Sequence, residues 1–287
     1  MVRKAIILCS GASTRFLPIS KSVCKEMLPI LNRPVIDYTI QDLKNNGITD
    51  ILIILDRNKE IIENYYDRNI ELENTLEMKG KHKELEEICN MYKDVNITFM
   101  RQIYGKGSGF NISKARNFVG DETFVLLFPD ELIWGDSCVR QMLEVYENTE
   151  TSVIPLRKVD IKDSYKYEMV DVQENELGLK ISNFIENPDP QDTPSDLSYI
   201  GGGVFTANVF NCLENSLEHK RGEVDIVDSF YGLMRIDDLY GCVVSGERID
   251  VGTSLGLIKG NIIAGLSDSR YREELLEFIK DIVNGES

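Results

Sequence analysis

Residues 5–29, AIILCSGASTRFLPISKSVCKEMLP, decide how the rest of the chain is interpreted. The stretch opens with a short apolar run at 5–8, which is typical of a strand covered on both faces in a parallel sheet. A loop follows that contains Gly11, several hydroxyl side chains and three cations. Backbone amides in a strand–loop–helix turn can bind phosphate, and glycine allows a close approach. The stretch therefore predicts an α/β fold with an anion site beyond its first strand.

The loop matches neither of two common phosphate-binding patterns. G-x-x-x-x-G-K-[ST] does not occur in the chain, and the loop lacks the spacing G-x-G-x-x-G, which argues against a dinucleotide-binding fold. From spacing alone, an ordinary strand–helix turn with surface cations is an equally good interpretation.

The remaining pattern alternates between strands and helices. Apolar runs at 51–55, 97–101, 124–128, 152–156 and 240–244 predict further strands. The segment 71–92 is rich in Glu, Lys and Leu and predicts a solvated helix or helical pair. Because the chain has no clear linker, we expect a single domain over 1–287. Short runs, prolines and a glycine triplet predict an antiparallel substrate-side insertion at about 157–206.

A C-terminal helix is predicted over 267–285. Ser267 or Asp268 is the expected N-cap, apolar residues recur on one face, and Gly285 lies just beyond the helix.

Composition excludes several classes of partner. The formal net charge is −16, with 48 acidic and 32 basic residues, which argues against nucleic acid or an anionic membrane as the main partner. No stretch approaches the ~20 apolar residues of a membrane span. The six cysteines lack C-x-x-C spacing, so we expect no zinc site but reduced thiols in the cytoplasm.

Two aspartates follow predicted strands. Asp130 comes directly after the most apolar run, and Asp250 ends a short strand. Ligands of open α/β sheets bind beyond the carboxyl ends of strands, where one or two carboxylates suit Mg²⁺. Each aspartate alone is more typical of a cap or turn. Together with the anion loop and Lys25, they suggest metal-assisted transfer of a phosphorus centre.

The ordered motifs resemble those of a known family. From residue 3 to about 261 the chain resembles the bacterial UTP–glucose-1-phosphate uridylyltransferases, which belong to the sugar nucleotidyltransferase superfamily. The matching motifs are Gly11-x-x-Thr14-Arg15-x-Leu17-Pro18, Lys25-Glu26-Met27-Leu28-Pro29, Arg101-Gln102, Gly107-x-Gly109, Leu127-x-Pro129-Asp130, Tyr167-x-x-Val170-Asp171, Glu186-x-Pro188, Gly222-Glu223 and Asp250-Val251-Gly252.

The resemblance implies a fold and a reaction. The fold would be a three-layer α/β/α, Rossmann-like (GT-A-like) nucleotidyltransferase with a mixed, mostly parallel central sheet. A glucose-1-phosphate oxygen, or that of a related sugar-1-phosphate, would attack the α-phosphorus of UTP. Pyrophosphate would leave, and UDP-glucose would form. Mg²⁺ is the implied cofactor, and a homo-oligomer is the expected assembly.

Site residues follow from the matching motifs. Arg15 and Lys25 would be catalytic, and Asp130 and Asp250 would hold Mg²⁺. The residues implied to bind nucleotide are Cys9, Ser10, Gly11, Ser13, Thr14, Glu26, Gln102 and Gly107. Those implied to bind the sugar phosphate are Tyr167, Glu168, Glu186 and Asn187.

Departures from the family pattern gather on the sugar-phosphate side. Asn187 stands where the family has lysine, Glu168 where it has glycine, and Gly202-Gly203 where it has Arg-Tyr. Two alternatives stay open for this reason. The acceptor could be a different phosphorylated molecule, or the chain could be a non-catalytic nucleotide-binding paralogue that acts as a regulatory subunit.

Overall fold

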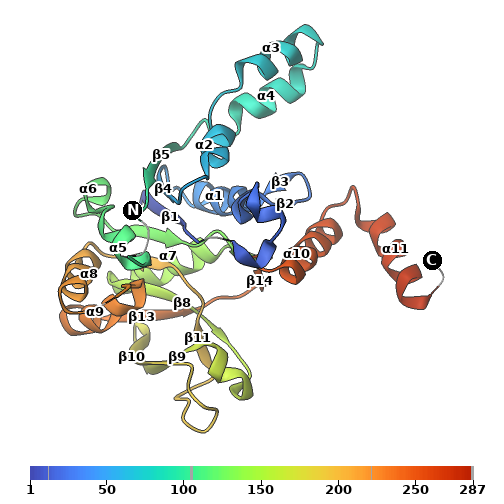
Figure 1. Ribbon diagram of the computed structural model, residues 1–287. Helices are drawn as coiled ribbons and strands as arrows, with labels where there is room; N and C mark the ends of the chain where they lie inside the picture. The colour runs from blue at the N-terminus through green and yellow to red at the C-terminus, as the bar shows by residue number, and fades with distance from the viewer. Residues whose placement is uncertain (12, 104–105, 221, 286–287) are drawn as a thin grey trace.

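The computed structural model describes residues 1–11, 13–103, 106–220 and 222–285 (Figure 1). Ala12 of the predicted anion loop and the last two residues of the predicted 1–287 domain lie outside the described residues. A ten-stranded sheet organises the chain, in the order β11-β9-β10-β13-β8-β12-β6-β1-β4-β5. Its strands are β1 Lys4–Cys9, β4 Asp50–Leu55, β5 Asn96–Arg101, β6 Phe124–Leu127, β8 Ser152–Lys158, β9 Glu168–Asn175, β10 Gly178–Glu186, β11 Leu197–Tyr199, β12 Gly203–Phe205 and β13 Leu239–Val243.

The sheet is mixed, as predicted. β1 pairs in parallel with both β4 and β6, β4 pairs in parallel with β5, and β8 pairs in parallel with β13. β12 runs antiparallel between β6 and β8. β9, β10 and β11 are antiparallel and extend the sheet at one end, where Figure 1 shows them projecting from the body.

Both faces of β1 are buried, which explains its uninterrupted apolar run. Ile6 and Leu8 belong to one hydrophobic cluster, and Ala5, Ile7 and Cys9 belong to a second one. Side chains alternate between the faces of a strand, so each cluster covers one face of the sheet. The apolar pattern of residues 5–8 is thus confirmed as a core strand.

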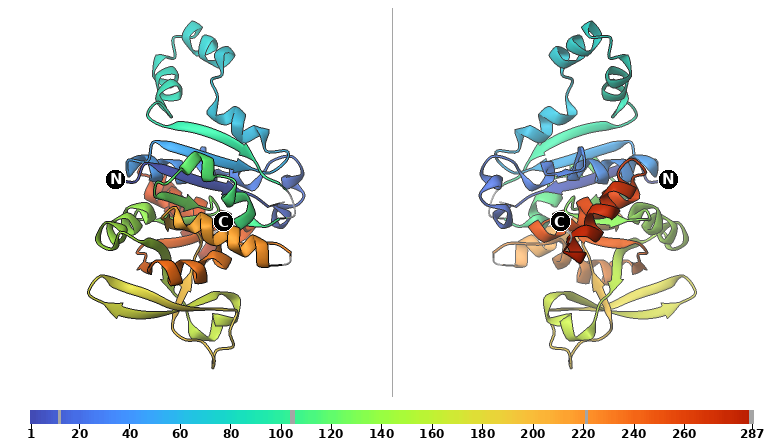
Figure 2. Two further views of the ribbon diagram at one scale, coloured as in Figure 1. Left: turned by 90° about the vertical axis from the view of Figure 1, so that its left-hand side faces the viewer. Right: turned by 90° about the vertical axis from the view of Figure 1, so that its right-hand side faces the viewer.

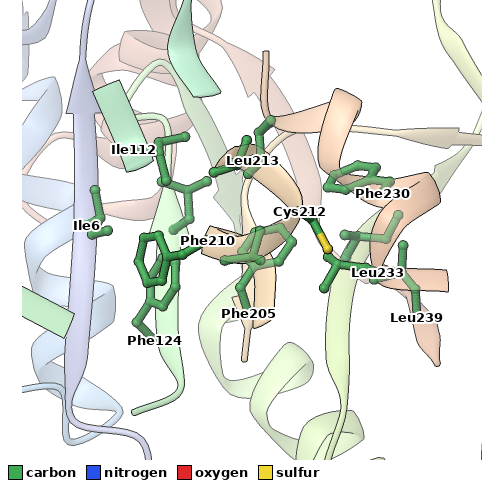
Figure 3. Packing of buried hydrophobic residues seen from close by; sticks show 14 of the residues in the cluster. Ile6, Ile112, Phe124, Phe205, Phe210, Cys212, Leu213, Phe230, Leu233 and Leu239 are labelled. Carbon is green, nitrogen blue, oxygen red and sulfur yellow. The ribbon is translucent and has the colours of Figure 1, made fainter. Parts of the chain in front are cut away.

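Helices cover both faces, as the three-layer prediction requires. α1 (Val35–Asn45) and α7 (Cys138–Thr149) pack on the face of Ala5 and Ile7. α5 (Ser108–Ser113), α8 (Asn208–His219) and α9 (Phe230–Ile236) pack on the face of Ile6. Figure 3 shows the aromatic centre of this second layer, where Phe124 and Phe210 stack with ring centroids 5.3 Å apart. The short helix α6 (Arg116–Val119) follows α5.

A third, smaller cluster sits beside the main sheet. It joins the ladder of β7 (Glu131–Trp134) and β14 (Glu247–Asp250), the ladder of β2 (Pro29–Ile30) and β3 (Arg33–Pro34), and helix α10 (Ser254–Ser267). Short 3₁₀ turns connect the larger elements of the described chain, and they are η1 Thr14–Phe16, η2 Ile19–Lys21, η3 Lys25–Met27, η4 Ile161–Lys166 and η5 Ile226–Ser229.

Two helical segments project from the body. α2 (Glu60–Tyr66) leads into a pair of helices, α3 (Ile70–Met78) and α4 (His82–Asn90), which confirms the helical-pair interpretation of 71–92. Figures 1 and 2 show this pair standing away from the sheet, and α11 (Arg272–Asn284) extending at another corner. None of the helices described is long and apolar enough to cross a membrane.

The C-terminal helix starts later than predicted. Neither Ser267 nor Asp268 caps it, because Ser267 ends α10 and the N-cap of α11 is Tyr271. The Asp268 carboxylate is occupied by the backbone and guanidinium of Arg270. The side chain therefore closes a turn between the two helices instead of capping the second one.

The substrate-side extension ends before residue 206. β12 pairs with β6 and β8 in the core, so residues 203–205 belong to the central sheet. The glycine triplet at its start has a backbone role: a Cβ on Gly202 would lie 2.4 Å from the carbonyl oxygen of Leu126, and its φ is +76°. A side chain is excluded there by the neighbouring strand.

We expect Gly202→Ala to lower the free energy of unfolding by about 2 kcal/mol more than Gly80→Ala, since both strain a left-handed backbone but only Gly202 meets another strand. Gly80 has a similar φ of +67°, and a Cβ on it would meet nothing within 4 Å. Chemical denaturation of the two variants measures the difference. Equal losses would contradict the close approach of residue 202 to β6.

Candidate active site

The anion loop leaves β1 with two residues in left-handed conformations. Gly11 has φ +107° and Ser13 has φ +51°, and a Cβ on Gly11 would point into open space. Thr14 and Arg15 follow in η1, and both side chains are exposed. The backbone conformation therefore presents a glycine edge and a guanidinium toward solvent, as expected for an anion-binding turn.

Lys25 links this loop to Asp130, which follows strand β6. Its backbone N–H donates to the Ser13 hydroxyl at 3.4 Å, and its ammonium contacts the carboxylate of Asp130. Burial alone would lower the pKa of Lys25, but Asp130 and Glu26 outweigh it and raise the pKa. Lys25 is therefore a fixed cation at the carboxyl ends of β1 and β6.

Asp130 and Asp250 are brought together by the short β7–β14 ladder. In this ladder Asp250 lies opposite Glu131, next in sequence to Asp130, and Val251 donates its N–H to the Asp130 carbonyl at 3.0 Å. A Cβ on Gly252 would lie 2.9 Å from Asp130 Oδ2 and 3.0 Å from Asp250 Oδ1. A Cβ at position 252 would therefore displace one of the two carboxylates.

The donor set at Gly252 suits one kind of metal. Among the described residues, no cluster of three or more His, Cys, Asp or Glu side chains is arranged to hold a metal. Two carboxylates beside a glycine cradle fit Mg²⁺, which takes one or two carboxylates and fills its shell with phosphates and water. Contact between the Lys25 ammonium and Asp130 also indicates that positive charge is favourable here.

Gln102 and part of the anion loop share a cleft of about 820 Å³. Gln102 follows β5, its backbone N–H donates to Leu55 at 2.8 Å, and its side chain lines the cleft together with Gly11 and Ser13. The structure thus brings three of the predicted nucleotide-binding residues to one hollow, beyond the carboxyl ends of β1, β4 and β5.

Gly107 is fixed by backbone packing. It is the N-cap of α5, with φ +87°, and a Cβ there would lie 2.4 Å from the Val224 carbonyl oxygen. Ser108 beside it donates from its hydroxyl to Asp225 at 2.8 Å. The turn is therefore held against residues 224–225 by close contact that only glycine permits.

A buried ion pair links the two ends of the anion loop. One of its members, Lys59, is not among the site residues predicted from the sequence. Glu26 is 1% exposed and pairs with Lys59 at 2.8 Å. Lys59 also donates to the backbone carbonyl of Cys9 at 3.0 Å. The signal available in the sequence was position alone, since Lys59 follows a buried strand in the same way as Asp130 does. Burial raises the pKa of the Cys9 thiol, which stays neutral.

The four predicted sugar-binding residues lie together, at the start of β9 and the end of β10. Glu168 and Glu186 are directly opposite each other in the ladder, and Asn187 donates its backbone N–H to Tyr167 at 3.0 Å. Asn187 has φ +49°, and its side-chain amide lies 3.5 Å from Glu186 Oε1. Among the described residues, no hydrogen bond or ion pair joins this group to Lys25 or Asp130.

The electrostatics of this second group are acidic. Burial, then Glu186, Asp225 and Asp228, raise the pKa of Glu168 to about 7. Lys220 pairs with Asp228 at 2.7 Å and supplies a cation at the edge of the group. The predicted sugar-binding residues thus lie among acidic side chains, whereas cationic side chains lie at the anion loop.

The raised pKa of Glu168 predicts a pH-dependent stability. The folded protein holds a proton on Glu168 that the unfolded chain releases near pH 4.5, so stability falls as pH rises from about 4.5 to about 7. Glu168→Gln removes this fall, and its Tm should exceed that of the parent at pH 8 by more than at pH 5. Glu176→Gln, at the exposed β9–β10 turn, is the matched control. Thermal unfolding at both pH values measures the effect, and equal differences at the two values would contradict the assignment.

Comparison with known proteins identifies the family to which the chain belongs. The nucleotidyl transferase family matches residues 4–263. The chain is 38% identical to UTP–glucose-1-phosphate uridylyltransferase 2 of Staphylococcus saprophyticus, over 98% of each chain. It is 36% identical to UTP–glucose-1-phosphate uridylyltransferase of Bacillus subtilis, over 99% of this chain and 98% of that one.

Solved structures match at the level of the whole fold. The UTP-bound UGPase from Acinetobacter baumannii superposes with a TM-score of 0.90 at 32% identity, covering 98% of this chain and 99% of that one. The similarity of sequence and of fold extends over nearly the full length of the chain, which confirms the resemblance to the uridylyltransferases. The chain therefore belongs to the nucleotidyl transferase family.

Proposed function

We propose that this protein transfers a uridylyl group from UTP to glucose-1-phosphate, releasing pyrophosphate and forming UDP-glucose. The observation that carries the proposal is that Asp130, just beyond β6, contacts the Lys25 ammonium and lies with Asp250 beside Gly252. Relatives named UTP–glucose-1-phosphate uridylyltransferase, at 36–38% identity over nearly the whole chain, supply the identity of the substrates.

The chemistry needs positioning and charge compensation more than a reactive side chain. A phosphate oxygen of the sugar-1-phosphate forms a bond to the α-phosphorus of UTP, the bond to the β-phosphate oxygen breaks, and pyrophosphate leaves. Lys25 is placed to neutralise charge that develops at the α-phosphate. The exposed Arg15 and the backbone near Gly11 are suited to hold the leaving phosphates.

Asp130 and Asp250 would hold Mg²⁺, which neutralises phosphate charge when bound. Cys9, Ser10, Ser13 and Thr14 complete the phosphate loop in this proposal.

The nucleotide base belongs in the cleft beside Gln102. The amide of Gln102 can both donate and accept, as a uracil edge requires, and the Gly107 backbone lies in the loop that follows. Glu26 would fix the end of the anion loop through its ion pair with Lys59. The acceptor belongs at the β9–β10 end, where Glu186 can accept from sugar hydroxyls.

The side chains of Asn187 and Glu168 are the reason to test several acceptors. An amide at 187 lacks the charge that a phosphate-binding cation would supply, and Glu168 adds a carboxylate beside it. A different sugar-1-phosphate is the second candidate acceptor for this reason.

The assay is pyrophosphate release with UTP, Mg²⁺ and a panel of sugar-1-phosphates. We expect turnover with glucose-1-phosphate and a loss of about 100-fold or more in Asp130→Ala, because Asp130 would hold the Mg²⁺ that neutralises phosphate charge. Asp121→Ala, at an exposed turn, is the control. Chelation of Mg²⁺ should also stop the reaction.

Three results would change the proposal. Normal activity in Asp130→Ala would remove that residue from the metal site. Turnover with another sugar-1-phosphate alone would reassign the acceptor. Binding of UTP without turnover on any acceptor would identify a non-catalytic nucleotide-binding subunit.

We also propose that two copies associate through α10 and α11, in the cytoplasm that six free cysteines favour. Phe278 and Ile282 lie four residues apart on one face of α11 and are 58% and 51% exposed, and Ile258 on α10 is 57% exposed. Such a face is typical of an interface.

Phe278→Glu combined with Ile282→Glu should convert a dimer to a monomer in light scattering coupled to size-exclusion chromatography, because charge is then placed on the apolar face. Leu177→Glu, at the equally exposed β9–β10 turn, should leave the dimer intact. A parent that is monomeric at micromolar concentration would refute the assembly.

A further inference from the structure

We propose that Lys59 is a positioning residue that fixes both ends of the phosphate-binding loop. The inference builds on the proposed function, because it concerns the loop that would hold UTP. Lys59 lies after β4, directly before α2, and its side chain is only 5% exposed. Its ammonium has two hydrogen-bond acceptors, the Cys9 carbonyl at 3.0 Å and Glu26 Oε1 at 2.8 Å.

The two acceptors stand at opposite ends of one loop. Cys9 is the last residue of β1, directly before the loop, and Glu26 lies in η3, beside Lys25. Lys25 in turn contacts Asp130. One ammonium group from a third segment therefore sets the distance between the start of the loop and the residue that reaches the metal site.

Lys59 holds the carboxylate of Glu26 in one orientation. Glu26 is 1% exposed, and its second oxygen, Oε2, has no hydrogen-bond partner among the described residues. Lys59 is thus the one described side chain that forms an ion pair with this carboxylate. Burying such a pair costs desolvation of two charges, and the best-attested return for that cost is a fixed register between segments.

Lys59 also lines the predicted nucleotide cleft. Lys59 and Cys24 line the same hollow as Gly11, Ser13 and Gln102. A shift of the loop would therefore change the shape of that cleft. Because its side chain is only 5% exposed and its ammonium is bonded to Cys9 and Glu26, Lys59 would act on the cleft through these two residues.

Lys59→Met removes the ammonium while it keeps most of the aliphatic stem. Arg33→Met is the matched control, because it likewise takes the cation from a buried carboxylate: Arg33 pairs at 3.2 Å with Asp37, which is 0% exposed, on the other side of η3. Lys59→Met/Glu26→Gln removes both charges of the pair. We expect Lys59→Met to lower Tm by about 10 °C, and the double variant to recover part of this loss.

The deciding measurement is hydrogen exchange of the whole, ligand-free protein. Peptides within residues 10–28 should exchange about 10-fold faster or more in Lys59→Met and in the double variant, but at the parent rate in Arg33→Met. Should Lys59→Met fail to fold, the double variant carries the comparison. Equal acceleration in Arg33→Met, or parent-like exchange in both Lys59 variants, overturns the proposal.

Calorimetry with UTP alone separates this inference from the proposed function. The Kd for UTP should weaken about 10-fold in Lys59→Met, with the KM for glucose-1-phosphate within about twofold of the parent. Unchanged affinity for UTP in Lys59→Met overturns the link to the cleft. A parent that binds no UTP refutes the proposed function, and the exchange result still decides whether Lys59 positions the loop.

Discussion

Parallel pairing of β1 with both β4 and β6 is the constraint on which the rest of the molecule depends. A strand held between two parallel neighbours is buried on both faces, so it must be apolar throughout and needs helices on both sides. The same pairing aligns the carboxyl ends of three strands at one edge. Every residue that we assign to the phosphates or to the metal comes from segments that leave this edge, or from the ladder beside it.

Charge is arranged locally against a strongly negative background. The chain carries a net charge of −16, yet its proposed substrates are anions. Cations at the anion loop are held in place by carboxylates: Asp130 contacts Lys25, and Glu26 pairs with Lys59. These pairs hold the ammonium groups of both lysines in place without a ligand. A bound triphosphate would then meet preorganised positive charge, which is the main contribution that a protein makes to this type of transfer.

The two ends of the proposed site differ in character. At the phosphate end, close backbone approach and ion pairs fix the geometry, as the packing of Gly107 on Val224 illustrates. At the acceptor end, Glu168 and Glu186 are directly opposite each other on two antiparallel strands. Burial and the neighbouring negative charges raise the pKa of Glu168 to about 7. A sugar bound there would be recognised through hydrogen bonds to its hydroxyl groups more than through attraction of an anion.

Features that arise from short-range chemistry can be predicted from the amino-acid sequence. A continuous apolar run predicts a buried strand, and glycine with cations after it predicts an anion loop. Lys25, Asp130 and Asp250 could be named because each directly follows such a run or belongs to a motif of the family. The start of α11 was misplaced because the Asp268 side chain bonds to Arg270 instead of capping the helix.

Which of these residues contact each other is visible only in the tertiary structure. Lys25 and Asp130 are 105 positions apart, and Glu26 and Lys59 are 33 apart, so their contacts depend on sheet order and register. Gly202 likewise has no local signature, since its requirement comes from a carbonyl on a neighbouring strand. Ion pairs and close backbone approaches of this kind join segments distant in sequence, and no local pattern records them.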